Sequence, residues 1–181
     1  MNLTAQIMDE KAISRAITRI CYEIVEKNRG SDGVCVIGIF TRGACLAKRI
    51  AGKISELEQR EIPIGYLDIT PYRDDMPRDE TIQDRTQLDF DIQHKKVVLV
   101  DDVLYTGRSV RAAIDALMAR GRPDKIQLAA LIDRGHRELP LRPDFIGKNV
   151  PTSREEKVVV RLKETDGADQ VAIIKETEEP K

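Results

Sequence analysis

A pair of adjacent carboxylates followed by a hydroxyl-rich turn is the stretch of this chain best suited to chemistry. Residues 97–110 read VVLVDDVLYTGRSV, so an apolar run leads into Asp101 and Asp102 and then into a turn with Thr106 and Ser109. If a helix follows the turn, its unpaired first amides and its dipole would bind an anion. The carboxylates repel an anion, but they accept hydrogen bonds from vicinal sugar hydroxyls or hold water around Mg²⁺. A phosphorylated ribose would satisfy both halves of the motif.

A simpler interpretation is that Ser109 caps a helix and that the aspartates lie at a solvated strand end. The combination of apolar strand, Asp-Asp and Thr-Gly-x-Ser favours the phosphate interpretation, with Gly107 letting the backbone approach the ligand. The sequence contains neither the P-loop pattern G-x-x-x-x-G-K-[ST] nor the dinucleotide pattern G-x-G-x-x-G. This argues against nucleotide triphosphatase and nicotinamide chemistry.

Apolar runs of strand length alternate with segments of helical period. Strands are predicted at 34–40, 62–70, 97–102 and 126–132, and helices at 12–28, at 44–58 and after the turn that follows Asp102. Alternation of this kind predicts an α/β fold, a Rossmann-like parallel sheet flanked by helices, in one domain of 181 residues. Ligands of such sheets bind at the carboxyl ends of the strands, where the two aspartates are expected.

Two further segments stand apart from this alternation. Residues 71–93 have no period and are dense in charge, which predicts a functional lid, a disordered segment or simply a solvated loop. Residues 157–176 contain two apolar runs around Thr-Asp-Gly-Ala-Asp, which predicts a C-terminal β-hairpin.

Composition limits the class of protein. Apolar residues make up 41% and charged residues 34% of the chain, and the net charge is −1, so nucleic acid could bind only at a local basic patch. The three cysteines show no C-x-x-C spacing, which indicates buried free thiols. The sequence starts without a signal-like segment and has no apolar run of spanning length, so we expect a cytoplasmic protein with no membrane partner.

The motif at 97–110 resembles the 5-phosphoribosyl-1-pyrophosphate (PRPP) signature of the type I phosphoribosyltransferases. Nearly the whole chain is similar to the branch that regulates the pyrimidine operon by attenuation and is also a uracil phosphoribosyltransferase. The residues that carry this closer likeness are TRI at 18–20, TRG at 41–43, LDITPYRDD at 67–75 and DRGHRELPLRPDFIGKNVPTS at 133–153.

The resemblance implies the type I phosphoribosyltransferase fold, the reaction of uracil with PRPP to UMP and pyrophosphate, and Mg²⁺ bound with PRPP. The alternative is a purine or orotate phosphoribosyltransferase with no role in RNA binding. The partners implied are PRPP, uracil, uridine nucleotides, pyrimidine-operon leader messenger RNA and further copies of the chain, in a homodimer or larger homo-oligomer.

The resemblance also implies roles for individual residues. Thr41-Arg42-Gly43 would hold pyrophosphate, although the same residues are as well explained locally as a strand-to-helix turn with a surface arginine. The lid, with Tyr72 and Arg73, would close over pyrophosphate. Asp101 and Asp102 would take the ribose hydroxyls, partly through water bound to Mg²⁺. The implied catalytic residues are Arg42, Arg73, Asp101 and Asp102. The implied PRPP-binding residues are Thr41, Arg42, Gly43, Asp101, Asp102, Val103, Leu104, Tyr105, Thr106, Gly107, Arg108 and Ser109.

Tyr105 bears on the choice of base. Hypoxanthine-guanine transferases have an aspartate at the matching position, whereas a tyrosine hydroxyl is a poor base at neutral pH. Uracil loses its N1 proton comparatively easily, so this residue favours a pyrimidine. The implied base-binding residues are Asp133, Arg134, Gly135, His136, Arg137 and Val158, with Lys157 as a neighbour of the last.

RNA binding is implied by the resemblance, while the local pattern alone is typical of a solvated basic face. Arg15, Arg19 and Tyr22 can share one helix face, and several arginines gather beside His136. The implied RNA-binding residues are Thr18, Arg19, Tyr22, Thr41, His136, Arg142 and Lys148. Relatives commonly have histidine in place of Tyr22 and leucine in place of Pro71. The first change puts RNA affinity in doubt, and the second is expected to stiffen the start of the lid.

Overall fold

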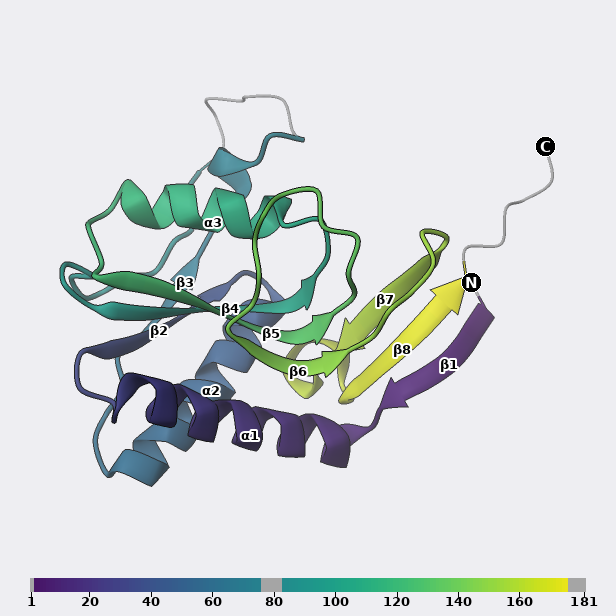
Figure 1. Cartoon of the computed structure of the whole chain (residues 1–181), viewed down its shortest axis with the longest axis horizontal. Coiled ribbons are helices and arrows are strands. Elements are labelled where there is room, and N and C mark those ends of the chain that lie inside the picture. Colours follow the sequence, from purple (N-terminus) through teal and green to yellow (C-terminus); the bar gives the residue numbers. More distant parts are fainter. Residues whose placement is uncertain (1, 76–82, 176–181) are drawn as a thin grey trace.

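A five-stranded parallel sheet forms the centre of the molecule (Figure 1). The computed structural model describes residues 2–75 and 83–175. The strands lie in the order β3-β2-β4-β5-β6, and every neighbouring pair is parallel. Their bounds are β2 Val34–Ile39, β3 Ile64–Leu67, β4 Lys96–Leu104, β5 Lys125–Asp133 and β6 Phe145–Asn149. The four strands that the sequence predicts are therefore confirmed within a few residues, and β6 is an addition.

Helices cover both faces of this sheet. The helices α1, Glu10–Asn28, and α2, Arg42–Glu58, lie on one face, and α3, Arg108–Met118, lies on the other (Figure 1). Neighbouring residues of a strand point to opposite faces, so Val36 of β2 packs with α1 and α2 while Ile37 packs with α3. Burial on both faces explains why the strands read as continuous apolar runs.

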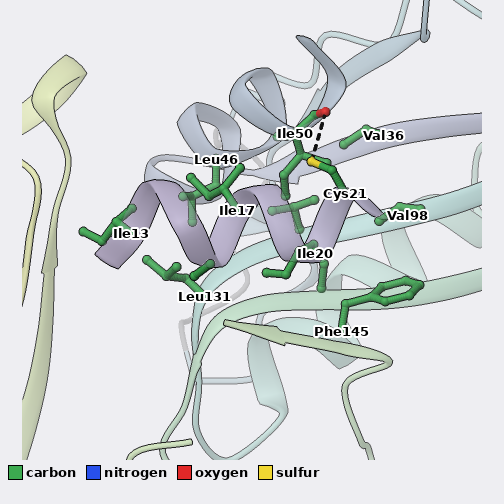
Figure 2. Close-up of a cluster of buried hydrophobic side chains, with 14 of the residues drawn as sticks. Ile13, Ile17, Ile20, Cys21, Val36, Leu46, Ile50, Val98, Leu131 and Phe145 are labelled. Carbon is green, nitrogen blue, oxygen red and sulfur yellow. Dashed lines mark hydrogen bonds between the residues drawn. The ribbon is translucent and has the colours of Figure 1, made fainter. Parts of the chain in front are cut away.

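The apolar stripe of α1 packs against α2 and the sheet. Ile13, Ile17, Ile20 and Ile24 are at most 6% exposed, as their helical spacing predicts. Figure 2 shows this stripe against Leu46 and Ile50 of α2, with strand residues beneath it. Burial of each such side chain stabilises the fold by about 1.5–3 kcal/mol.

The cysteines are free, and two of the three are buried as expected. The Cys21 thiol lies 3.7 Å from the carbonyl oxygen of Ile50 (Figure 2). Burial raises the pKa of Cys21 and of Cys35 to about 12, so neither thiol is a nucleophile at neutral pH. Cys45 departs from the expectation because it is only partly buried, one turn into α2.

A second, antiparallel sheet lies beside the first (Figure 1). The predicted C-terminal hairpin is confirmed as β7, Glu156–Arg161, paired with β8, Gln170–Lys175, and a short helix, α4, Lys163–Asp166, lies between them. The sequence pattern does not predict β1, Asn2–Met8, which pairs with β8. Its partner lies at the other end of the chain, so no local pattern marks it.

The strand β6 was missed for a similar reason. It is five residues long and follows a proline-rich stretch, so its apolar pattern is short. The neighbouring β5 provides its hydrogen bonds and its burial. A Cβ at Gly147 would lie 2.4 Å from the carbonyl oxygen of Leu131, so this glycine is required by the close packing of the two strands. Within the described residues, no helix is both long and apolar enough to cross a membrane.

Candidate functional site

The carboxyl end of β4 and the start of α3 line a cavity of about 400 Å³. Asp101 to Leu104 close the strand, the turn follows, and α3 begins at Arg108. The cavity is lined by Arg73, Asp75, Asp101, Val103, Leu104, Tyr105, Thr106, Gly107, Arg108, Ser109, Val110 and Glu138. Nearly all of the predicted phosphate-binding turn is therefore brought around one hollow. Leu104 is an exception in one respect, because its side chain is in the core and only its backbone can face a ligand.

The start of α3 has the geometry of an anion site. Gly107 is the N-cap residue, with φ +94°, and no side chain caps the helix in the described part of the chain. The interpretation of Ser109 as a cap is therefore wrong, since it lies inside the first turn. The Arg108 amide makes only a long hydrogen bond, 3.4 Å, to the Thr106 hydroxyl. The first amides of α3 and the two hydroxyls are thus placed to bind a phosphate.

Asp101 and Asp102 differ in their surroundings. Asp101 is 8% exposed, and burial, together with the charge of Asp102, raises its pKa well above the ordinary value. Its Oδ1 accepts a hydrogen bond of 2.9 Å from the Asp102 amide, and Asp102 Oδ1 accepts one of 2.8 Å from the Val103 amide. Each carboxyl group keeps a second oxygen for a ligand. Hydroxyl donors or a cation arriving there would offset the cost of this burial.

The segment Thr41-Arg42-Gly43 lies directly against this strand end. The Phe40–Thr41 peptide bond is cis. A Cβ at Gly43 would lie 2.6 Å from the carbonyl oxygen of Val100 and 3.3 Å from Cα of Asp101. The sequence predicts a helix from residue 44, with Gly43 in the turn before it. Instead α2 begins at Arg42, and Gly43 is an ordinary helical residue that is required by close packing.

The arginines of the candidate site are each paired with a carboxylate. Arg42 binds Asp166, with Nε and Nη2 at 3.1 and 2.8 Å from the two carboxylate oxygens. Arg73 binds Asp75, with one contact of 2.7 Å. All four side chains are at least 21% exposed, so solvent screens the attraction within both pairs.

Arg108, in the predicted phosphate turn, is also paired. It binds Glu138 and Asp74, each at 2.8 Å. The sequence pattern did not predict these carboxylates or Asp166 as part of the site. Asp74 directly follows the motif residue Arg73, but no local signal marks Glu138 or Asp166 as neighbours of an arginine.

The described ends of the predicted lid meet at one buried carboxylate. Asp68 is 2% exposed and accepts hydrogen bonds from the Thr70 amide at 3.0 Å, the Thr70 hydroxyl at 2.6 Å and Arg85 Nε at 2.9 Å. Pro71 is the second residue of a short 3₁₀ turn, Thr70–Tyr72. Residues 76–82 of the lid lie outside the described part, so the lid itself stays a prediction.

We predict that Asp68→Asn lowers the free energy of unfolding at neutral pH by about 2 kcal/mol, the usual worth of hydrogen bonds to a charged group. Burial alone would raise the pKa of Asp68, but the hydrogen bonds from Thr70 and Arg85 outweigh it and lower the pKa to about 2. The stabilisation is therefore present above the unfolded-state pKa of about 3.9 and is lost as the pH falls toward 2.

Urea unfolding of wild type and variant at several pH values measures this effect. The difference between them should shrink below about pH 4. Asp89→Asn, an exposed aspartate of the same segment, is the control and should change little. If the difference in unfolding free energy between wild type and Asp68→Asn does not change with pH, the lowered pKa of Asp68 is contradicted.

The predicted base-binding stretch lines a second cavity, of about 950 Å³. Asp133 to Arg137 form one wall, and residues around Arg142 and Ile146 form another. Val158 does not join them, because it lies in β7 with its side chain 7% exposed in the core. Tyr105 links the two cavities, since its ring packs 3.9 Å from the Arg134 guanidinium.

Two arginines of the expected basic patch, Arg134 and Arg137, make their hydrogen bonds to other residues of the protein. Arg134 is 8% exposed and donates to the Thr152 hydroxyl at 3.0 Å and to the Glu156 carbonyl at 2.7 Å. Arg137 binds both carboxylate oxygens of Asp133 at 2.7 Å. These arginines therefore shape the wall of the cavity, and the exposed positive charge of this region comes from Arg142, Lys148 and Arg154.

The other predicted RNA-binding residues lie mainly on α1. Thr18, Arg19 and Tyr22 line a shallow hollow of about 420 Å³, and Tyr22 is 57% exposed. Arg19 Nη2 donates to the carbonyls of Ile146 and Gly147 in β6, at 2.9 and 2.5 Å, which joins α1 to the rim of the larger cavity.

Thr41 does not lie with this group. It follows β2, three strand positions from β6 in the sheet, which is about 14 Å at the usual spacing. The structure groups it with the segment that packs on Asp101. His136 is on the wall of the larger cavity, and its Nε2 lies 2.5 Å from the Thr152 carbonyl oxygen.

Comparison with known proteins identifies the family. The family model described as "Phosphoribosyl transferase domain" matches residues 4–165. The chain is 63% identical over 171 residues to the "Bifunctional protein PyrR" of Acetivibrio thermocellus, covering 93% of each chain. It is 54% identical to that of Halalkalibacterium halodurans, covering 94% of this chain and 97% of the relative, and 55% identical to that of Deinococcus radiodurans, covering 93% of each.

The chain belongs to the PyrR branch of the phosphoribosyltransferase family. Solved structures confirm the fold. A hypoxanthine phosphoribosyltransferase from Staphylococcus aureus matches with a TM-score of 0.69 at 18% identity, covering 95% of this chain and 96% of that one. The enzyme from Trypanosoma cruzi matches with a TM-score of 0.71 at 13% identity, covering 96% and 97%. The resemblance to the pyrimidine-operon branch and the type I fold are therefore both confirmed.

Proposed function

We propose that this phosphoribosyltransferase converts uracil and PRPP to UMP and pyrophosphate, and that it also binds pyrimidine-operon leader RNA in response to uridine nucleotides. One observation carries the enzymatic part. The uncapped start of α3, the paired aspartates and the Gly43 segment meet at the carboxyl ends of β2 and β4. These three features offer, side by side, donors for a 5-phosphate, acceptors for ribose hydroxyls and an arginine for pyrophosphate.

The donor set suits Mg²⁺ carried with PRPP. Asp101 and Asp102 supply two carboxyl groups, and no cluster of three or more His, Cys, Asp or Glu side chains fit for a metal occurs within residues 2–75 and 83–175. Mg²⁺ commonly binds one or two carboxylates and otherwise water and substrate phosphates. Bound with PRPP, it would neutralise charge on the departing pyrophosphate.

The protein's own contribution is to position and stabilise charge. The turn of Thr106 to Ser109 would hold the 5-phosphate, and Asp101 and Asp102 would orient the ribose. N1 of uracil would form the new bond to C1′ of the ribose as the bond from C1′ to the pyrophosphate oxygen breaks, and the N1 proton passes to solvent. Arg42 and Arg73 would stabilise the charge on the leaving pyrophosphate.

A panel of bases tests the substrate. Purified protein with PRPP and Mg²⁺ should release pyrophosphate with uracil and not with hypoxanthine, guanine or orotate. Turnover of hypoxanthine or orotate in place of uracil would overturn the choice of a pyrimidine and favour the alternative transferase.

The regulatory part is supported by the exposed residues of α1 and β6. Phosphates would pair with Arg142 and Lys148, and bases of looped RNA would stack on Tyr22. Binding to a nascent transcript would place the protein in the cytoplasm, and the homo-oligomer implied by the resemblance stays a prediction. Leader RNA should bind more tightly than an unrelated hairpin, and UMP should change that affinity through linkage.

We predict that Tyr22→Ala weakens binding of leader RNA by about tenfold, the usual effect of removing one stacked base contact. The ring is 57% exposed on a helix, so alanine should not lower stability. Fluorescence anisotropy with labelled leader RNA measures the affinity.

Met118→Ala is a matched control, because Met118 is 53% exposed on α3, across the sheet from α1. It should leave RNA affinity unchanged, and equal affinity of wild type and Tyr22→Ala would contradict the assignment. Arg19→Ala is a poorer test, since Arg19 also holds two carbonyls of β6.

A further inference from the structure

A carboxylate from the C-terminal sheet reaches the arginine that is proposed to bind pyrophosphate. Asp166 ends α4, the short helix between β7 and β8, whereas Arg42 begins α2. Sequence resemblance assigns Arg42 a role but none to Asp166. The contact joins residues 124 positions apart, and it lies at the edge of the site described above.

The geometry of the pair uses only one side of the guanidinium. Arg42 Nε donates to Asp166 Oδ2 at 3.1 Å and Nη2 donates to Oδ1 at 2.8 Å, so the Nε–Nη2 edge is occupied. The Nη1 group makes no hydrogen bond to the described residues. A guanidinium bound in this way is fixed in plane and direction, and its other edge stays available for an anion.

Asp166 is itself held firmly. Its Oδ2 also accepts hydrogen bonds from the Leu162 amide at 2.9 Å and from the Thr165 hydroxyl at 2.8 Å. With the two bonds from Arg42, the carboxylate accepts four donors, which is about its full capacity. The hydrogen bonds from Arg42 and Leu162 hold the pKa of Asp166 well below its usual range, so it stays charged.

Arg42 also lies within electrostatic range of Asp102. Hydrogen bonding to Asp166, and to a smaller extent the charge of Asp102, raise the pKa of Arg42. The guanidinium is therefore held by a fixed carboxylate, and Asp102 of the proposed site acts on it through its charge.

We propose that Asp166 is a positioning residue for Arg42, which fixes the guanidinium so that its Nη1 edge receives the pyrophosphate of PRPP. This deepens the proposed function and rests on it. The opposite role, in which Asp166 competes with pyrophosphate for Arg42, would require the carboxylate to release its edge of the guanidinium. The four donors on Asp166 oppose such a release.

The same helix provides a matched control. Arg49 lies two turns after Arg42 on α2 and binds Glu164 and Asp169, with Nε to Glu164 Oε1 at 2.8 Å and Nη1 to Asp169 Oδ2 at 2.7 Å. These contacts attach α4 and its surroundings to α2 in the same manner but involve no residue of the proposed site. Glu164→Gln therefore weakens the attachment without touching Arg42.

The experiment compares wild type, Asp166→Asn, Asp166→Glu and Glu164→Gln. Binding of magnesium pyrophosphate is measured by calorimetry, and KM for PRPP and for uracil is measured by steady-state kinetics. Asp166→Asn should weaken pyrophosphate binding and raise KM for PRPP by about tenfold, because a misdirected arginine loses its alignment. KM for uracil should stay within about twofold, as should all constants of Glu164→Gln.

Asp166→Glu keeps the charge but moves the carboxylate by one methylene. It should therefore weaken pyrophosphate binding less than Asp166→Asn does. This variant takes the place of Asp166→Asn if the latter folds poorly. Unchanged or tighter pyrophosphate binding in Asp166→Asn would overturn the proposal. An equal loss in Glu164→Gln would also overturn it, because attachment of α4 would then be the cause. If wild type binds pyrophosphate but does not use uracil, the proposed function fails while the calorimetric test of Asp166 still stands.

Discussion

Asp102→Asn should reduce kcat/KM for PRPP by about 10- to 100-fold, the loss expected when a charge-assisted hydrogen bond to the substrate is weakened. Asp102 Oδ1 already accepts the Val103 amide, so the remaining oxygen is the one placed for a ribose hydroxyl or for water on Mg²⁺. Asparagine has nearly the same shape but lacks the charge. Kinetics with varied PRPP measure the effect, and KM for uracil should change little.

RNA binding separates this effect from unfolding. The predicted RNA-binding residues are mainly on α1 and β6, so leader RNA affinity of Asp102→Asn should stay within about twofold of wild type. Asp115→Asn is the control for loss of one aspartate charge, because Asp115 lies exposed on α3 and its one ion pair within the described residues is with Arg111, at 3.3 Å. Equal loss of turnover and RNA affinity in Asp102→Asn would show that the two activities are not separable.

Gly43→Ala should lower kcat/KM by about 100-fold, because displacement of a site by about 1 Å commonly has that effect. The added Cβ would lie 2.6 Å from the carbonyl oxygen of Val100 and 3.3 Å from Cα of Asp101. Both contacts are with backbone, so the start of α2 must move away from β4. This movement separates Arg42 from the aspartates, and the overpacking itself should lower stability by about 1–3 kcal/mol.

Gly52→Ala is the matched control on the same helix. A Cβ at Gly52 meets nothing within 4 Å, and alanine is the better helix former, so activity should be kept and stability should rise by up to about 1 kcal/mol. Steady-state kinetics measures the activity of the two variants, and urea unfolding measures their stability. Wild-type activity in Gly43→Ala would show that the contact of α2 with β4 is not needed for catalysis.

Local pattern accounts for a large part of the fold. Ile13, Ile17, Ile20 and Ile24 repeat with the helical period because α1 buries one face, and the strands read as unbroken apolar runs because both faces of the sheet are covered. Elements with weak local patterns, such as β1 and β6, were missed. The strand β1 is stabilised by pairing with β8, which lies at the other end of the chain. The strand β6 is stabilised by pairing with β5, which also supplies most of its burial.

The site divides in the same way. The sequence alone determined the motif from Asp101 to Ser109, since the strand, the carboxylates and the turn follow one another within a few residues. It also determined the likeness to the phosphoribosyltransferases. Only the tertiary structure decided that Gly43 packs on the backbone of Val100, that Arg134 is buried beneath Tyr105 and that Asp166 holds Arg42. These contacts join segments that come together only when the chain folds. The energy of each contact depends on the distance between its atoms in space, and that distance cannot be read from the spacing of residues along the sequence.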